Sequence, residues 1–116
     1  IYGFPVRVAR GGKCMEKRFL MLARVRLLPP TQGRRSEIYS GLKPIFEYRD
    51  FSTSGRIIFE GQRSLAPGHE CNAMIDLLDY DDQLAQIHLG ESLRIYDGIQ
   101  PIGEAFVIES CTVRDD

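Results

Sequence analysis

The chain has 116 residues, of which 43% are hydrophobic and 27% are charged, a composition typical of one globular domain that can bury a core. Its formal net charge of −1 conceals a division, because residues 1–63 carry 13 basic and 5 acidic side chains whereas residues 64–116 carry 2 and 11. No stretch approaches the roughly 20 apolar residues of a membrane helix and the start lacks the apolar run of a secretory signal, so we expect a cytoplasmic protein without membrane contact.

The first part of the sequence predicts short strands separated by turns. Residues 6–9 alternate briefly and end at two glycines, and residues 19–28 form the longest β-like run. Within this run four apolar residues share one face, while Arg24 and Arg26 point to the other. A Pro-Pro pair ends the run, because proline cannot donate to a strand ladder.

The middle of the chain continues the pattern. Residues 44–49 and 56–59 predict two strands, with a turn at residues 50–55 between them. Residues 72–78 fit either a strand or a helix by period alone, and the spacing of the neighbouring strands favours a strand. Residues 80–83 predict an acidic loop.

The C-terminal part predicts a short strand at residues 87–89, a strand at 93–96, a hairpin turn at Asp97-Gly98 and a closing strand at 102–110. No segment shows a sustained apolar period of 3.6 residues. Strands at roughly ten-residue spacing predict an all-β sandwich or barrel. Closing the sheet into a barrel would also remove exposed strand edges.

Five segments, taken in order, carry a resemblance to a known family. They are Gly33-Arg34-Arg35-Ser36, Gly41-Leu42-Lys43-Pro44-Ile45-Phe46-Glu47-Tyr48-Arg49, Ser54-Gly55-Arg56-Ile57, Leu65-Ala66-Pro67-Gly68-His69 and the hairpin at residues 93–107. Their order resembles the C-terminal (third) β-barrel domain of elongation factor Tu. That family has Gly-Gly-Arg-His-Thr, Gly-Tyr-Arg-Pro-Gln-Phe-Tyr-Phe-Arg, Thr-Gly-Thr-Ile, Val-Met-Pro-Gly-Asp and Arg-Glu-Gly-Gly-Arg-Thr-Val-Gly-Ala-Gly in the same order.

The resemblance implies a closed antiparallel six-stranded β-barrel over residues 19–116. The basic N-terminal segment at residues 1–18 has no clear counterpart in the family, and we expect it to join the barrel. The chain would be a stand-alone relative or an excised domain. In the family, this domain contacts the T stem of aminoacyl-tRNA and packs against the GTPase domain, so the resemblance also implies a translation-related role.

The resemblance further suggests which residues would face RNA. Arg34 and Ser54 match an arginine and a threonine of the family, Arg35 replaces a histidine, and Asp97-Gly98 matches a Glu-Gly pair. Two positions depart from the family: Ile45 replaces a glutamine, and Asp81-Asp82 lie where the family tends to have Lys or His. Together with the basic strand, the RNA-binding candidates are Arg24, Arg26, Arg34, Arg35, Lys43, Ser54, Asp97 and Gly98.

The division of charge has three interpretations: a polyanion partner, a complementary protein surface, or pairing between the two halves. A stripe of Lys and Arg would bind RNA through its phosphates, but alternating arginines also occur on any solvated strand face. In a closed barrel the first and last strands meet, which would bring basic residues near Glu104, Glu109, Asp115 and Asp116. Exposed ion pairs contribute roughly 0–1 kcal/mol each, too little to explain the division by stability alone.

Catalysis has little support in the sequence. The chain lacks the GxxxxGK[ST] phosphate loop, so we expect no nucleotide. Cys14, Cys71 and Cys111 lack C-x-x-C spacing, and the only local metal-ligand spacing is His69-Glu-Cys71, so we expect free thiols and no metal. A Cys–His pair with His69 or His88 is a weaker alternative.

The acidic residues Asp79, Asp81 and Asp82 lack the spacing of a calcium loop, so we expect them to be solvated. His88 falls in an apolar alternation, which predicts a structural role. We therefore expect a non-catalytic β-barrel interaction module without a cofactor, one that docks onto a protein partner. The alternative is an RNA-binding (tRNA-binding) module that uses the basic half.

Overall fold

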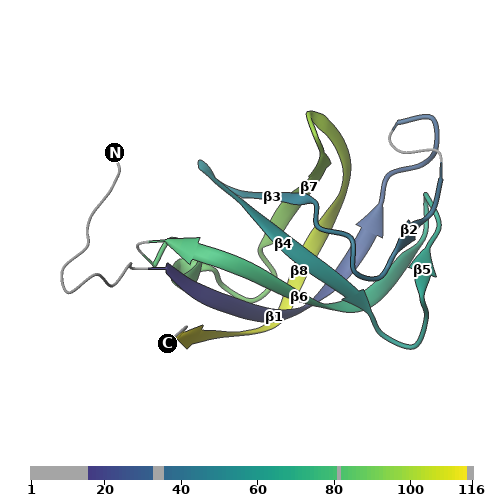
Figure 1. The fold of residues 1–116 in the computed structure, drawn as a ribbon. Helices are drawn as coiled ribbons and strands as arrows, with labels where there is room; N and C mark the ends of the chain where they lie inside the picture. The colour runs from purple at the N-terminus through teal and green to yellow at the C-terminus, as the bar shows by residue number, and fades with distance from the viewer. Residues whose placement is uncertain (1–15, 33–35, 81, 115–116) are drawn as a thin grey trace.

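The computed structural model describes residues 16–32, 36–80 and 82–114, and six strands of this part form a closed antiparallel barrel (Figure 1). The barrel strands are β1 (Glu16–Leu27), β3 (Ile45–Tyr48), β4 (Phe51–Phe59), β6 (Glu70–Tyr80), β7 (Ser92–Asp97) and β8 (Gln100–Arg114). A separate two-stranded sheet pairs β2 (Ile38–Tyr39) with β5 (Ser64–Leu65), and a short 3₁₀ helix, η2 (Leu84–Gln86), follows β6.

The order of strands around the barrel is β1-β6-β4-β3-β7-β8, and β1 pairs with both β6 and β8. The predicted all-β, closed, six-stranded antiparallel fold is therefore confirmed. Strand β1 begins at Glu16, so residues 16–18 are part of the barrel sheet. Residues 1–15, with the alternation expected at residues 6–9, lie outside the described residues.

The core follows from the two-residue period of the strands. On β1, every second residue from Phe19 to Leu27 is apolar, points inward and is buried. The alternating residues of β6 fill the barrel in the same way, with Ala73, Ile75 and Leu77 fully buried. Strand type at residues 72–78 is thus confirmed, because only a two-residue period places these three side chains on one face.

Two glycines allow neighbouring strands to approach closely. A Cβ atom at Gly55 on β4 would lie 2.9 Å from the carbonyl oxygen of Asp76 on β6. A Cβ atom at Gly103 on β8 would lie 2.5 Å from the carbonyl oxygen of Arg26 on β1. Any larger side chain at these positions would force the strands apart.

Two predicted elements are wrong. The turn expected at residues 50–55 is confined to Arg49 and Asp50, because Phe51 already pairs with Tyr48 and β4 begins there. Arg49 takes a positive φ of 55°, which makes this tight reversal possible.

The short strand expected at residues 87–89 is absent. The chain forms η2 at residues 84–86 instead, and the buried Leu84 and Ile87 close over the barrel from this loop. The local apolar pattern therefore reflects burial in a loop rather than pairing in a sheet.

Candidate functional site

The two charged halves of the chain pair with each other across the barrel. Arg18 on β1 donates to Asp76 on β6, with 3.3 Å between Nε and Oδ1 and a second contact between Nη2 and Oδ2. Further pairs join Arg24 to Glu70 at 3.1 Å, Arg26 to Glu104 at 3.8 Å and Lys17 to Asp82 at 2.5 Å. Pairing between the halves, one of the three interpretations of the charge division, is therefore present in the structure.

Most of these pairs join β1 to β6 or to the loop after it, rather than to the last strand. Of the acids expected opposite the basic segment, Glu104 pairs with Arg26, whereas no ion pair joins Glu109 to another described residue. Asp115 and Asp116 lie outside the described residues. The partners are on β6 because its register places Asp76 and Glu70 directly opposite Leu20 and Arg26, within reach of the neighbouring arginines.

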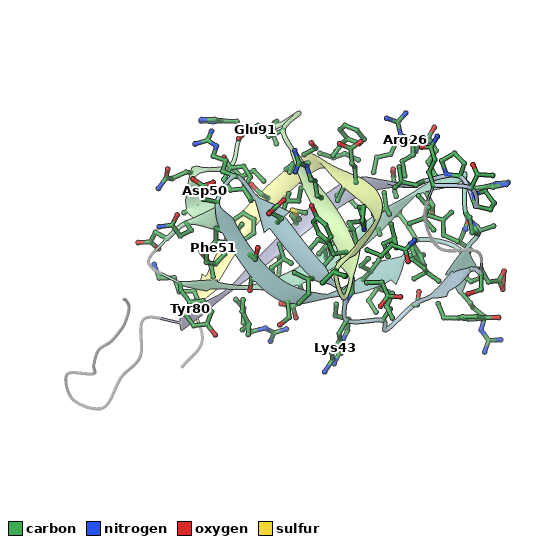
Figure 2. The ribbon with its side chains drawn as sticks, turned by 90° about the horizontal axis from the view of Figure 1, so that it is seen from above. Arg26, Lys43, Asp50, Phe51, Tyr80 and Glu91 are labelled. Atoms are coloured by element: carbon green, nitrogen blue, oxygen red, sulfur yellow. The ribbon has the colours of Figure 1, made fainter. Side chains whose placement is uncertain are left out.

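Arg24 and Arg26, two of the RNA-binding candidates, are exposed as predicted but engaged. Arg24 bonds both Glu70 and Asn72, the latter at 3.0 Å. Arg26 also lies over the ring of Phe106, with 5.4 Å between its Cζ and the ring centroid. Figure 2 shows Arg26 near one end of the barrel, with Asp50, Phe51 and Glu91 toward the other. Arg34 and Arg35 lie outside the described residues.

Lys43 and Ser54, by contrast, come together in a shallow pocket of about 210 Å³, which we call the cationic pocket. Lys43 precedes β3 and projects away from the ribbon (Figure 2), and Ser54 lies on β4. Arg18, Arg56 and Asp76 complete the polar lining. No ion pair joins Lys43 or Arg56 to another described residue, so the pocket has two cations available to an anion.

Sequence reasoning missed Arg18 and Arg56 as members of this pocket. Both occupy outward positions, but only the register of β4 and β1 on β6 shows that they meet, since Asp76 pairs with Arg56 on one side and Leu20 on the other. Asp97 and Gly98 are at the β7–β8 hairpin, where the loop is Gly98-Ile99. Neither Asp97 nor Gly98 is among the described residues that line the cationic pocket.

An apolar surface lies beside the cationic pocket and crosses four strands. Met74 on β6 pairs with Ile58 on β4 and with Leu22 on β1, and Ile108 sits in the bulge of β8 opposite Leu22 and Ala23. Ile58 and Met74 are each 45% exposed and Ile108 is 41% exposed. Scattered exposed apolar residues are ordinary, but here they are adjacent in the sheet.

A groove of about 290 Å³ opens in this surface, and we call it the apolar groove. The half-buried Leu20 and Leu22 and the exposed Met74 supply its apolar lining, and Glu60 and Glu109 supply carboxylates. The run at residues 19–28 contained the signal, since Leu20 and Leu22 share the outward face with Arg24. The pattern of this run alone does not reveal the groove, because the register of β1 with β6 and β8 brings Met74 and Glu109 to these leucines.

The end of the barrel near η2 contains a buried carboxylate, Asp79. Its Oδ1 accepts a hydrogen bond of 2.9 Å from the backbone N–H of Leu84, and its Oδ2 has no partner among the described residues. Burial raises the pKa of Asp79. The expectation that Asp79 is solvated is wrong, because its inward position on β6 carries it into the barrel and its carboxylate caps the start of η2.

A second carboxylate at this end, Glu91, holds the loop before β7. It accepts hydrogen bonds from the backbone N–H of His88 at 2.7 Å, the Tyr48 hydroxyl at 2.8 Å and Arg49 Nη2 at 3.1 Å. These donors, the His88 N–H above all, lower the pKa of Glu91 to about 2. We expected a structural role for the His88 side chain. Its ring is exposed instead, and the structural contact is the hydrogen bond from its backbone N–H to Glu91.

The part of the chain that the structure describes contains no assembled site for nucleophilic catalysis or for metal binding. The Cys71 thiol is buried and lies 3.1 Å from the carbonyl oxygen of Asn72, while His69 is exposed in its turn. No cluster of three His, Cys, Asp or Glu side chains suited to a metal occurs among those residues.

Comparison with known proteins gives no assignment. No protein-family model matches the chain, and no curated protein shows a significant match.

Among the described residues, no helix has the length and apolar character needed to cross a bilayer.

Proposed function

We propose that this chain is a non-catalytic interaction module that docks onto a protein partner through the apolar groove. The carrying observation is the continuity of Leu22, Ile58 and Met74 across three hydrogen-bonded strands. A contiguous exposed apolar patch that contains a groove and has a charged rim is typical of protein interaction sites. The rim here consists of Glu60 and Glu109.

The role of the barrel in translation, and its place in the cytoplasm, belong to the same proposal. They rest on the order of motifs that resembles the third domain of elongation factor Tu, and the closed six-stranded antiparallel barrel agrees with the fold that this resemblance implies. In that setting the partner is a component of the translation machinery. The ion pairs of the basic half favour protein over RNA, because they occupy the arginines of β1.

Affinity purification with matched variants tests the docking proposal. We expect the wild-type chain to retain one dominant protein from a lysate of the source cells, and Met74→Asp to reduce its recovery at least about tenfold, the equivalent of roughly 1.4 kcal/mol of binding energy. Ile99→Asp is the control, because Ile99 is 98% exposed at the tip of the β7–β8 hairpin. Equal recovery by all three proteins would refute docking through the groove.

RNA binding is the second candidate, and the cationic pocket favours it. Lys43 and Arg56 flank Ser54 without an ion-pair partner among the described residues, as a phosphate contact requires. We expect tRNA affinity to fall steeply with salt, and Lys43→Ala with Arg56→Ala to lower the salt slope by about 1 per lost phosphate contact. Arg63→Ala, at another exposed cation without an ion pair to a described residue, is the control. Absence of tRNA binding at low salt would reject this candidate.

A further inference from the structure

The apolar groove contains two carboxylates that form no ion pair within the part of the chain that the structure describes. The outward-facing acids of β6 are neutralised, Asp76 by Arg18 and Glu70 by Arg24. Glu60 and Glu109 have no ion pair with another described residue, yet both line the groove. The groove is thus apolar at its centre and negative at its margins.

The register of the strands places the two carboxylates on opposite sides of the apolar centre. Glu60 follows β4, and its backbone N–H bonds the carbonyl oxygen of Asn72 at 2.9 Å. Glu109 on β8 pairs with Leu22 on β1. Strands β6 and β1 lie between them with Met74 and Leu22, so the two backbones are three interstrand steps apart, roughly 14 Å.

An extended peptide matches this spacing. In a strand-like segment the side chains at positions i, i+2 and i+4 share one face, and the outer two are about 13 Å apart. We infer that the groove binds an extended protein segment with an apolar side chain at its centre and a Lys or Arg two positions to either side. The apolar side chain packs on Leu22 and Met74, and the two cations meet Glu60 and Glu109. This inference rests on the proposed docking function and names the chemistry of the partner.

Charge favours this occupant over a nucleic acid. A phosphate backbone would face two carboxylates at the groove without a cation in its lining, and phosphate contacts depend on Lys and Arg. A basic segment would form favourable ion pairs with Glu60 and Glu109 at the two margins of the groove. Such charge complementarity selects the partner and sets the register of binding.

Peptide titration followed by NMR of the full-length ¹⁵N-labelled chain tests the inference. The probe is the peptide Gly-Ser-Lys-Thr-Leu-Thr-Lys-Ser-Gly, compared with one having Glu in place of both Lys and one having Ser in place of Leu. We expect saturable shifts at the amides of Leu20, Leu22 and Met74, and an affinity about five- to tenfold higher than for either control peptide.

A charge exchange makes the test specific. The Glu60→Lys, Glu109→Lys double variant is expected to lose the preference for the Lys peptide and to bind the Glu peptide about five- to tenfold more tightly than wild type does. Asp50→Lys is the control, because Asp50 is exposed at the turn before β4 and far along that strand from Glu60. Folding of each variant is checked from the dispersion of the same spectra.

Three results would overturn the inference: no saturable shift with any peptide, equal affinity for the Lys and Glu peptides, or a preference unchanged by the charge exchange. Self-association that covers the groove, seen by analytical ultracentrifugation, would also overturn it, because the occupant would then be a second copy. If Met74→Asp abolishes partner recovery while the peptides fail to discriminate, docking stands and only the partner chemistry is wrong. If both experiments fail, the docking proposal fails as well.

Discussion

Arg18 and Asp76 face each other across β1 and β6 in a two-point ion pair that links the basic half of the chain to the acidic half. The side chains are 47% and 29% exposed, so water and salt weaken the attraction. The pair nevertheless has a functional consequence. It occupies Arg18, which lines the cationic pocket, so that this arginine is not available to an anion there.

The first prediction concerns this pair. A double-mutant cycle with Arg18→Ala and Asp76→Ala is expected to give a coupling energy of about 0.2–1 kcal/mol, the range for exposed ion pairs. The measurement is urea unfolding at low and high salt, and the coupling is expected to shrink as salt rises. A coupling of several kcal/mol that ignores salt would show that the pair is buried, contrary to the structure.

The second prediction concerns Gly55. Alanine at this position is expected to destabilise the barrel by about 1–3 kcal/mol, because its Cβ would meet the Asp76 carbonyl and the Leu77 side chain. Ser52→Ala, at an exposed position of the same strand, serves as the control and is expected to stay within about 0.5 kcal/mol of wild type. Denaturant unfolding of both variants decides, and equal stabilities would show that β4 and β6 are not closely packed at this point.

The third prediction concerns the acid sensitivity of Glu91. Its pKa is lowered to about 2 in the folded chain, so the ionised form stabilises the fold above the unfolded-state pKa of 4.5, and this stabilisation is lost as the pH falls from 4.5 toward 2. Glu91→Gln is therefore expected to lower the Tm most at pH 7 and least near pH 2. Thermal unfolding over this range gives the answer, and a Tm difference independent of pH would contradict the hydrogen-bond network around Glu91.

The fourth prediction has the opposite sign. Burial raises the folded-state pKa of Asp79 above its ordinary value of 3.8. The desolvation cost to the folded chain is therefore absent below pH 3.8 and appears as the pH rises through the folded-state pKa. Asp79→Asn retains an oxygen to accept the Leu84 N–H and removes the charge. We expect the Tm of the variant relative to wild type to be higher at pH 7 than at pH 3. A Tm difference independent of pH would mean that Asp79 is solvated, and the reverse trend would mean that the fold stabilises its ionised form.

The fold was predictable because its signals are local. The alternation from Phe19 to Leu27 defines the buried face of β1, and Asp97-Gly98 marks the hairpin between β7 and β8. The wrong elements arose where a contact from elsewhere decides the structure. Asp79 shapes the loop at residues 84–86 from five residues away, and Glu91 holds the Tyr48–Arg49 corner from the loop before β7.

The candidate site was less predictable, because it depends on register. Lys43 and Ser54 were singled out by resemblance, but the addition of Arg18 and Arg56 follows from pairings between strands far apart in sequence. The apolar groove combines Leu22, Met74 and Glu109 in the same way. Composition and spacing do not contain this information, since a shift of one residue in register would turn each side chain to the opposite face.

Site-specific photocrosslinking tests the docking proposal most directly. A photoreactive phenylalanine derivative at position 74 is compared with the same residue at position 99, and each sample is treated with nuclease before analysis. Docking through the apolar groove predicts one dominant protein adduct from position 74 that survives nuclease, and none from position 99. A nuclease-sensitive adduct, or equal adducts from both positions, would contradict it.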